Sequence, residues 1–460
     1  MIQINTPLKF TVRRCAPELI VPAKPTPREV KHLSDIDSQE IVRIQFPVVF
    51  FYHADPKLGN ENPASVIKEA LAKVLVYYYP LAGRLKEDQS RKLMVDCTGE
   101  GVLFIEAEAD VTLKEFGDFV HPPFPCSEEL AYDVPGSSSI LDSPLLLIQV
   151  IRLLCGGFIV TTRFNHAIMD ASGLVQFMTA LSEMAKGAST PSTLPVWQRE
   201  VLSARDPPRV TCTHPEYDEL ATAEDNTGRY SSSDDMHQRS FFFGPREMLA
   251  IRRLVPTHLQ NSTNFEVLTA CLWRCRTIAL QLNPEEEVRM IYMFNSRKFK
   301  SFIPIGYYGN ASAFPVAIST AKDICNKTLG FSLELIVKAK STVTKEYMRS
   351  IADLMVIKGR PPLKLSESYS VSDVTRAGFD RVDFGWGKPA YGGTVVGASR
   401  IYSIYLRSKN HKGESGIVVP ICLPEVTMEK FIRELNSMLV QDNNDKEVQE
   451  LELHTLNSKL

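Results

Sequence analysis

Apolar residues recur along the chain in two rhythms, one typical of strands and one typical of helices. Residues 145–153 and 157–164 are apolar, β-branched runs joined near Cys155-Gly-Gly, which predicts a buried antiparallel pair of strands. Residues 63–77 begin with a proline and repeat apolar positions at helical spacing, which predicts an amphipathic helix. The same spacing over residues 173–184 predicts a helix soon after the second strand.

The second half repeats this mixture in irregular order. We expect helices over residues 264–280, 329–355 and 428–439, and strands around 399–406 and 417–422. Residues 189–240 are rich in Pro, Ser, Thr and acidic side chains, which indicates a linker. We therefore divide the chain into an N-terminal domain (1–188), a crossover (189–240) and a C-terminal domain (241–460). An α/β fold with mixed sheets fits this order better than a doubly wound parallel sheet.

Composition narrows the class of protein. A chain of 460 residues can bury a large core, and its size favours two domains. The net charge of −2 gives no global attraction to polyanions, so we expect no nucleic-acid partner. The nine cysteines are scattered without a CxxC pair, which indicates reduced thiols. The sequence has no apolar run long enough to span a bilayer and no secretory leader pattern, so we expect a soluble, non-secreted protein.

His166 and Asp170 form an HxxxD motif between the second predicted strand and the helix that follows it. A histidine titrates near neutral pH and can therefore accept a proton from a weakly acidic nucleophile. A second copy of the pattern, from His214 to Asp218, lies in a proline-bearing segment that we interpret as a loop. The strand-to-helix context favours His166 as the catalytic candidate.

The C-terminal tripeptide Ser458-Lys459-Leu460 matches the peroxisomal address that an import receptor binds. The residues before it are polar enough to extend freely toward a receptor. We expect peroxisomal import, or a cytosolic protein if the signal is not used. A coincidental match in a structural tail is the alternative.

Four motifs in fixed order resemble the plant BAHD family of CoA-dependent acyltransferases, and the resemblance covers nearly the whole chain. They are Tyr79-Pro-Leu-Ala-Gly-Arg84, the HxxxD stretch, Tyr308-Gly-Asn310 and Asp383-Phe-Gly-Trp-Gly387. The resemblance implies two chloramphenicol-acetyltransferase-like domains of similar size with a solvent channel between them. Acyl-CoA would enter as co-substrate from one face and the alcohol from the other. It implies a monomer. We expect no permanently bound cofactor and no metal, because the histidines and cysteines lack metal-ligand spacing.

The implied chemistry needs a base and an oxyanion donor, since a thioester is already activated. His166 would take the hydroxyl proton and return it to the departing CoA sulfur, without an acyl-enzyme. The resemblance implies a structural salt bridge from Asp170 to Arg297, with a Ser-His-Asp-type orienting role as the alternative. Asp383 could compete for Arg297. Ser372 is the oxyanion candidate by position, although the nearby Val374 departs from the tryptophan of some family members.

The remaining candidate residues are those that could contact the acyl-CoA. The resemblance implies that Asp383, Gly385, Trp386 and Gly387 support the architecture, with direct cofactor contact as the alternative. The GxGxxA match from Gly385 is not a dinucleotide site, because a proline and a strand-like segment follow it. The CoA phosphates require local donors, and the candidates are Thr263, Lys298 and Lys300. A solvated basic turn is the alternative for the two lysines.

Within the family, residues 33–37, 91–101 and 194–197 look most like the alcohol acyltransferases. The resemblance implies benzoyl transfer from benzoyl-CoA to benzyl alcohol, giving benzyl benzoate and CoA. An acetyl-CoA-dependent alcohol acetyltransferase and a non-catalytic acyl-CoA-binding or interaction protein are the alternatives. Four apolar side chains near the motif would suit an aromatic ring, and core packing explains them as well: Phe164, Ile168, Phe177 and Met178.

Overall fold

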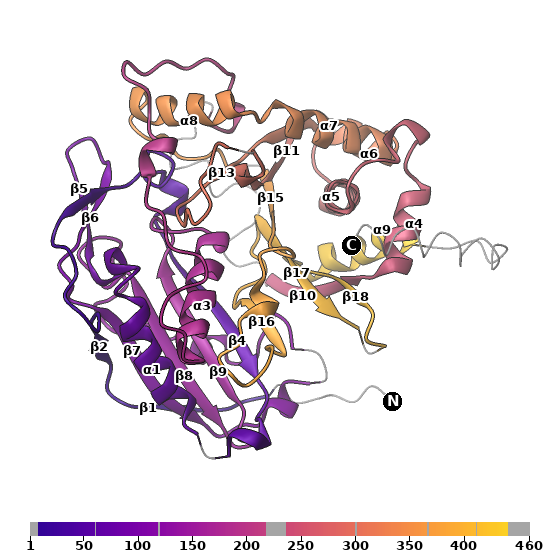
Figure 1. Cartoon of the computed structure of the whole chain (residues 1–460). Coiled ribbons are helices and arrows are strands. Elements are labelled where there is room, and N and C mark those ends of the chain that lie inside the picture. The colour runs from indigo at the N-terminus through magenta and orange to yellow at the C-terminus, as the bar shows by residue number, and fades with distance from the viewer. Residues whose placement is uncertain are drawn as a thin grey trace.

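The chain folds into two halves, each built on its own mixed sheet (Figure 1). The computed structural model describes residues 8–59, 61–117, 120–217, 236–299, 301–365, 368–410 and 412–439. Within these residues the helices are α1 (Pro63–Val74), α2 (Ser127–Leu130), α3 (Ala171–Ala185), α4 (Pro245–Arg253), α5 (Asn264–Leu280), α6 (Ala321–Asn326), α7 (Leu329–Thr342), α8 (Lys345–Ile357) and α9 (Glu425–Leu439). None of the described helices is both long and apolar enough to cross a bilayer.

The first half surrounds a sheet with strand order β1-β7-β8-β9-β4-β16, and β2 also pairs with β7. Its strands are β1 (Val12–Arg14), β2 (Glu18–Ile20), β4 (Gln45–Tyr52), β7 (Val102–Ala109), β8 (Leu146–Leu153), β9 (Phe158–Asn165) and β16 (Tyr391–Thr394). The predicted antiparallel pair is confirmed as β8 and β9. A small sheet of β3 (Val30–His32), β6 (Leu93–Asp96) and β5 (Arg84–Glu87) lies beside it.

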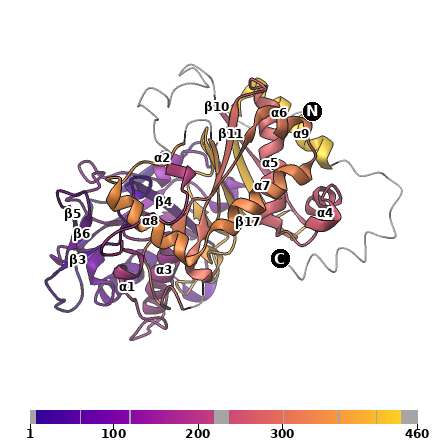
Figure 2. The same ribbon diagram turned by 90° about the horizontal axis from the view of Figure 1, so that it is seen from above.

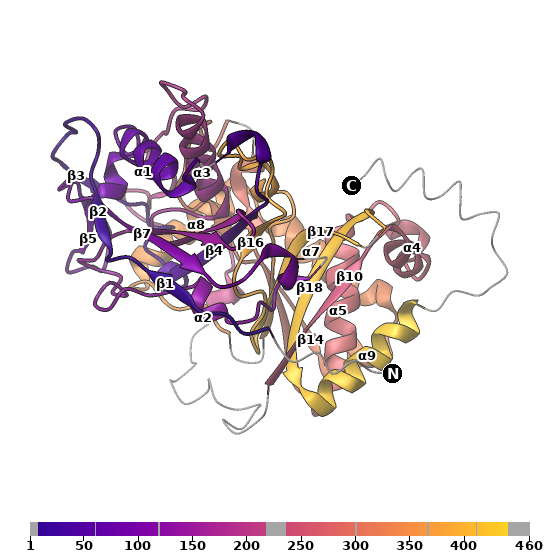
Figure 3. The same cartoon turned by 90° about the horizontal axis from the view of Figure 1, so that it is seen from below.

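The second half surrounds a sheet with strand order β10-β18-β17-β15-β11-β14. Its strands are β10 (Met236–Phe243), β11 (Glu287–Tyr292), β14 (Val316–Thr320), β15 (Ser368–Asp373), β17 (Tyr402–Lys409) and β18 (Ser415–Pro424). Strands β12 (Phe294–Asn295) and β13 (Ser312–Ala313) form a separate pair. Helices α5 and α9 lie against the second sheet (Figure 3). The mixture of parallel and antiparallel pairing confirms the predicted fold class.

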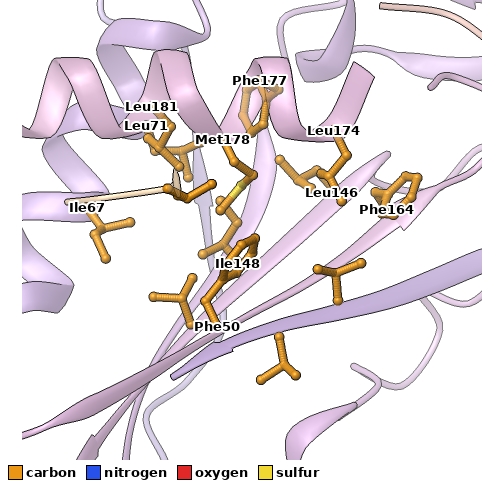
Figure 4. Close-up of a cluster of buried hydrophobic side chains, with 14 of the residues drawn as sticks. Phe50, Ile67, Leu71, Leu146, Ile148, Phe164, Leu174, Phe177, Met178 and Leu181 are labelled. Carbon is orange, nitrogen blue, oxygen red and sulfur yellow. The ribbon is translucent and has the colours of Figure 1, made fainter. Parts of the chain in front are cut away.

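Helices α1 and α3 cover one face of the first sheet (Figure 4). Phe177 and Met178 extend from α3 into a fully buried cluster with Leu71 and Ile148. Ile168 is fully buried as well. These three predicted ring-contact candidates are therefore core residues, because their apolar area is removed from water by the sheet. Phe164 is the exception, since it also lines the cavity described below.

The single helix predicted over residues 329–355 is wrong. The structure has two helices there, α7 and α8, separated at Val343 and Thr344. The Thr344 hydroxyl accepts a hydrogen bond from the backbone N–H of Tyr347 and so starts α8 as an N-cap. Helix α7 runs along the second half, whereas α8 lies over the first (Figure 2).

The predicted domain boundaries need two corrections. Strand β10 begins at Met236, inside the expected crossover, and pairs with β18 along its whole length. Strand β16 of the C-terminal half joins the first sheet as the neighbour of β4. A linear division at residue 241 missed this exchange, because strand pairing between distant segments leaves no local pattern in the sequence.

Part of the crossover packs tightly. His214 lies in a loop, as predicted, but is buried: its Nε2 contacts the Ser350 hydroxyl of α8 at 2.8 Å and its Nδ1 contacts Glu216 at 3.2 Å. Arg205 binds Asp353 of the same helix through Nε at 2.6 Å. Both ring nitrogens of His214 are engaged in these contacts, so His214 has a structural role. Asp218, the other end of the second HxxxD copy, lies outside the described residues.

Candidate active site

His166 lines an apolar cavity of about 250 Å³ that lies between the two halves. The cavity walls come from β4 and the HxxxD loop of the first half, and from β11 and β15 of the second. A neighbouring cavity of about 460 Å³ shares the wall residues Ala171, Tyr292, Met293 and Val374. The two cavities therefore adjoin. A larger pocket of about 1080 Å³ around His53 and Cys155 does not include His166.

The His166 ring is held at the C-terminal end of strand β9. The residue follows β9 directly, and its backbone N–H donates to the Ile44 carbonyl at 2.9 Å. The Phe46 ring lies edge-on to the imidazole, with centroids 5.8 Å apart. The Nδ1 atom is buried and makes no hydrogen bond of good geometry. The half-buried residue lines the cavity and its Nδ1 is closed off, which leaves Nε2 as the nitrogen for a substrate.

Burial lowers the pKa of His166 below its ordinary value. A contact with its own carbonyl and the nearby Asp170 carboxylate act in the opposite direction but do not reverse the shift. The imidazole is therefore neutral at pH 7, the protonation state that a general base needs.

Asp170 points away from the imidazole. Its Oδ1 accepts a hydrogen bond from the Gly173 N–H at 3.0 Å and caps α3, while its Oδ2 accepts from Arg297 Nη1 at 2.6 Å and from the Ala311 N–H at 3.1 Å. The predicted Asp170–Arg297 pair is confirmed. No hydrogen bond joins Asp170 to His166 within the described residues, so the geometry contradicts the alternative of a Ser-His-Asp-type orienting role.

A second buried network fixes the backbone of the motif. Asp37 accepts hydrogen bonds from Arg199 Nη1 at 2.9 Å and from Asn310 Nδ2 at 2.9 Å. Arg199 then donates to the Ile168 carbonyl, and Asn310 donates to the His166 carbonyl. A Cβ atom on Gly309 would lie 1.8 Å from Arg199 Nη1, so this position requires glycine.

Sequence reasoning missed this role of Asp37, Arg199 and Asn310. Asp37 and Asn310 were singled out only as parts of family-like stretches, and Arg199 carried no signal of its own. The three residues come from the first half, the crossover and the second half, and Asp37 and Arg199 are almost fully buried. The network therefore fixes the position of His166 by joining three distant chain segments.

Ser372 is on β15 and lines the same cavity as His166. Its hydroxyl lies 3.9 Å from the Met293 sulfur, a weak contact that a substrate oxygen would readily displace. The structure thus brings the predicted oxyanion candidate and the predicted base to one chamber.

The Asp383–Gly387 loop lies at the other end of the first sheet. Asp383 accepts hydrogen bonds from the Gly385 and Gly387 N–H groups at 2.8 and 2.9 Å, and its charged partner is Lys186 at 3.6 Å. Both glycines have positive φ values, of 114° and 84°. The Trp386 ring packs on Phe158, at the opposite end of β9 from His166. These contacts hold the loop together, neither of the two adjoining cavities is lined by its residues, and Asp383 pairs with Lys186 instead of Arg297.

The adjoining cavity is basic. It is lined by Lys298, Lys340, Arg376 and Arg407, and Thr263 lies at its wall as the N-cap of α5. Burial, assisted by the positive charge of Lys340, lowers the pKa of Lys298. The structure therefore places the predicted Thr263 and Lys298 together at a helix N-terminus, an arrangement suited to anions. The predicted Lys300 lies outside the described residues. Among the described residues no cluster of side chains has the composition of a metal site.

Comparison with known proteins places this geometry in a family. A family model described as the Transferase family matches residues 10–438. The chain belongs to the BAHD family of acyltransferases. It is 61% identical over 443 residues to the benzyl alcohol O-benzoyltransferase of Petunia hybrida, covering 95% of this chain and 96% of the relative. The Nicotiana tabacum protein of the same name is 59% identical with the same coverage.

Other relatives and solved structures agree with this assignment. Alcohol acyl transferase 1 allele GSa of Malus domestica is 52% identical, covering 94% of this chain and 95% of the relative. Vinorine synthase has the same fold, with a TM-score of 0.71 at 22% identity, covering 94% of this chain and 99% of that one. TRI101 of F. sporotrichioides, complexed with coenzyme A and T-2, has a TM-score of 0.65 at 18% identity, covering 88% and 97%. The chain is an acyl-CoA-dependent alcohol acyltransferase, which sets aside the non-catalytic alternative.

Proposed function

We propose that the protein transfers the benzoyl group of benzoyl-CoA to benzyl alcohol, forming benzyl benzoate and CoA. The proposal is based on the neutral imidazole of His166, which lines an apolar chamber that adjoins a basic cavity. The names of the Petunia and Nicotiana relatives supply the substrates. The two cavities are the ends of one reaction channel, with the acyl-CoA in the basic one and the alcohol in the apolar one.

The apolar chamber suits an uncharged alcohol. His166 and Asp170 are the lining residues that could carry a charge. His166 is neutral at pH 7, and the Asp170 carboxylate forms an ion pair with Arg297. A charged acceptor would find no counter-ion there and would lose its hydration. An aromatic alcohol instead buries apolar surface against side chains that include Ile36, Ile44, Phe46, Phe314 and Leu363.

The reaction needs one proton to move in two steps. The alcohol donates a hydrogen bond to His166 Nε2, and its proton passes to Nε2 as the alcohol oxygen bonds to the thioester carbonyl carbon. The Ser372 hydroxyl donates to the oxyanion that forms. When the intermediate collapses, the carbon–sulfur bond breaks and Nε2 returns the proton to the CoA sulfur. No covalent enzyme intermediate is required.

The basic cavity would hold the CoA phosphates. Lys298 supplies a positive charge, and the N-terminus of α5, which Thr263 caps, adds the positive end of a helix dipole. The Lys298 ammonium lies over the Phe294 ring, 3.8 Å from its centroid, and Glu266 pairs with the neighbouring Lys340. Phosphate binding would also raise the lowered pKa of Lys298 back toward its ordinary value.

A substrate matrix tests the proposal. The purified protein would be supplied with benzoyl-CoA or acetyl-CoA, each with benzyl alcohol or hexanol, and the released thiol and the ester would be quantified. The proposal expects the highest kcat/KM for benzoyl-CoA with benzyl alcohol. A clear preference for acetyl-CoA would establish the alcohol acetyltransferase alternative instead.

A further inference from the structure

Thr394 places an unpartnered hydroxyl in the wall of the reaction chamber. The residue ends β16 and is 2% exposed. Its Oγ1 is buried and has no hydrogen-bond partner, although the residue lines the cavity that contains His166. A buried hydroxyl without a partner is costly, so its persistence inside a substrate chamber indicates a ligand that satisfies it.

The sheet register places Thr394 relative to the reacting centre. Thr394 pairs with Val48 of β4, so both side chains project to the same face of the sheet. Phe46, two residues earlier on β4, shares that face and contacts the His166 ring. Two residues along a strand span about 7 Å. An aromatic ring with its reacting carbon at His166 would therefore extend over Phe46 and direct its far substituent toward Thr394.

We propose that Thr394 is a distal hydrogen-bonding subsite for an aromatic substrate that carries a hydroxyl or ether oxygen at the ring position opposite the reacting group. The Thr394 hydroxyl donates to that oxygen. The inference rests on the proposed function, because the ring belongs to either the alcohol or the acyl group of the same transfer. Val48, the partner of Thr394 on β4, is apolar, and the lining residues of the cavity include no Lys or Arg, so an uncharged oxygen suits the subsite better than a carboxylate.

Thr162 offers a matched control. It lies opposite Val48 on the other neighbouring strand, β9, and is 1% exposed. Its hydroxyl is also buried without a partner, but Thr162 does not line the chamber. Thr394→Val and Thr162→Val thus each remove a hydroxyl from a residue that pairs with Val48. Only Thr394→Val changes the lining of the cavity that contains His166.

The experiment compares substrates of equal shape. One arm pairs 4-methoxybenzyl alcohol with 4-ethylbenzyl alcohol, using benzoyl-CoA as donor. The other pairs 4-methoxybenzoyl-CoA with 4-ethylbenzoyl-CoA, using benzyl alcohol. The parent protein should favour the methoxy substrate in one arm by about 3- to 10-fold in kcat/KM, as expected for one neutral hydrogen bond. The arm that shows the preference identifies which ring reaches Thr394.

Thr394→Val should abolish the preference by lowering kcat/KM for the favoured methoxy substrate, and Thr394→Ser and Thr162→Val should keep the preference. Melting temperatures establish that each variant is folded. Equal use of methoxy and ethyl substrates by the parent in both arms overturns the subsite, with no variant needed. A preference that survives Thr394→Val overturns it too. Absence of thiol release with benzoyl-CoA and every alcohol would instead refute the proposed function.

Discussion

At the scale of single residues, proton transfer depends on a neutral His166. Burial lowers its pKa below the ordinary 6.5, so a base mechanism predicts full activity at neutral pH. As pH falls through the lowered pKa, the imidazole gains a proton and kcat/KM should decline. A pH profile of kcat/KM for the parent enzyme would show an acidic limb with an apparent pKa below 6.5. An acidic limb centred above 6.5 would contradict the burial argument.

Asp170 should matter for stability more than for proton transfer. Asp170→Asn leaves an amide that can still cap α3 but removes the negative charge beside Arg297. We expect a loss of about 1–3 kcal/mol in the free energy of unfolding, less than for a fully buried pair because Arg297 keeps a fifth of its side chain exposed. Denaturant unfolding measures the loss. Unchanged stability together with a shifted acidic limb in the pH profile would favour an orienting role.

At the scale of elements, sequence patterns predicted those helices and strands whose formation depends on residues close together in the chain. The predicted helix over residues 264–280 coincides with α5, because its apolar spacing and the Thr263 cap are both local. The break between α7 and α8 was missed because apolar spacing continues through it. The strand-like segment after the Asp383–Gly387 motif is confirmed as β16, but its place beside β4 in the first sheet was missed, because pairing between distant segments leaves no local pattern.

The α7–α8 break gives an element-scale prediction. Thr344 caps α8 with its hydroxyl, whereas Thr328 stands at the N-cap of α7 without a side-chain hydrogen bond. Thr344→Ala should therefore lower the free energy of unfolding by about 1 kcal/mol, and Thr328→Ala should lower it by less. Chemical denaturation of both variants supplies the comparison. Equal losses would show that the Thr344 hydroxyl is not what starts α8.

At the scale of the whole molecule, the site depends on contacts that no local pattern encodes. The sequence indicated His166, Asp170 and Arg297 as a group because the motifs are short and family-like. It did not indicate that Asp37, Arg199 and Asn310 would meet behind the motif, because those residues are far apart in the chain and join only in the folded protein. The pairing of β16 with β4 of the first half was missed for the same reason.

The predicted import is also tested on the whole chain. Ser458, Lys459 and Leu460 lie outside the described residues, so peroxisomal targeting stays a prediction of the sequence. We expect a fluorescent protein fused before residue 1 to permit import, and one fused after Leu460 to block it. Fluorescence microscopy of plant cells with a peroxisomal marker distinguishes the two. Equal import of both fusions would exclude recognition of a free terminal tripeptide.

Thiol release from benzoyl-CoA in the presence of benzyl alcohol, measured for the parent and for His166→Ala, tests whether His166 is the general base. General-base catalysis by His166 predicts turnover by the parent and a fall of about 10²- to 10⁴-fold in kcat for the variant, the usual contribution of a general base. Ester formation must fall in parallel with thiol release. A folded His166→Ala protein that forms benzyl benzoate at the rate of the parent would contradict it.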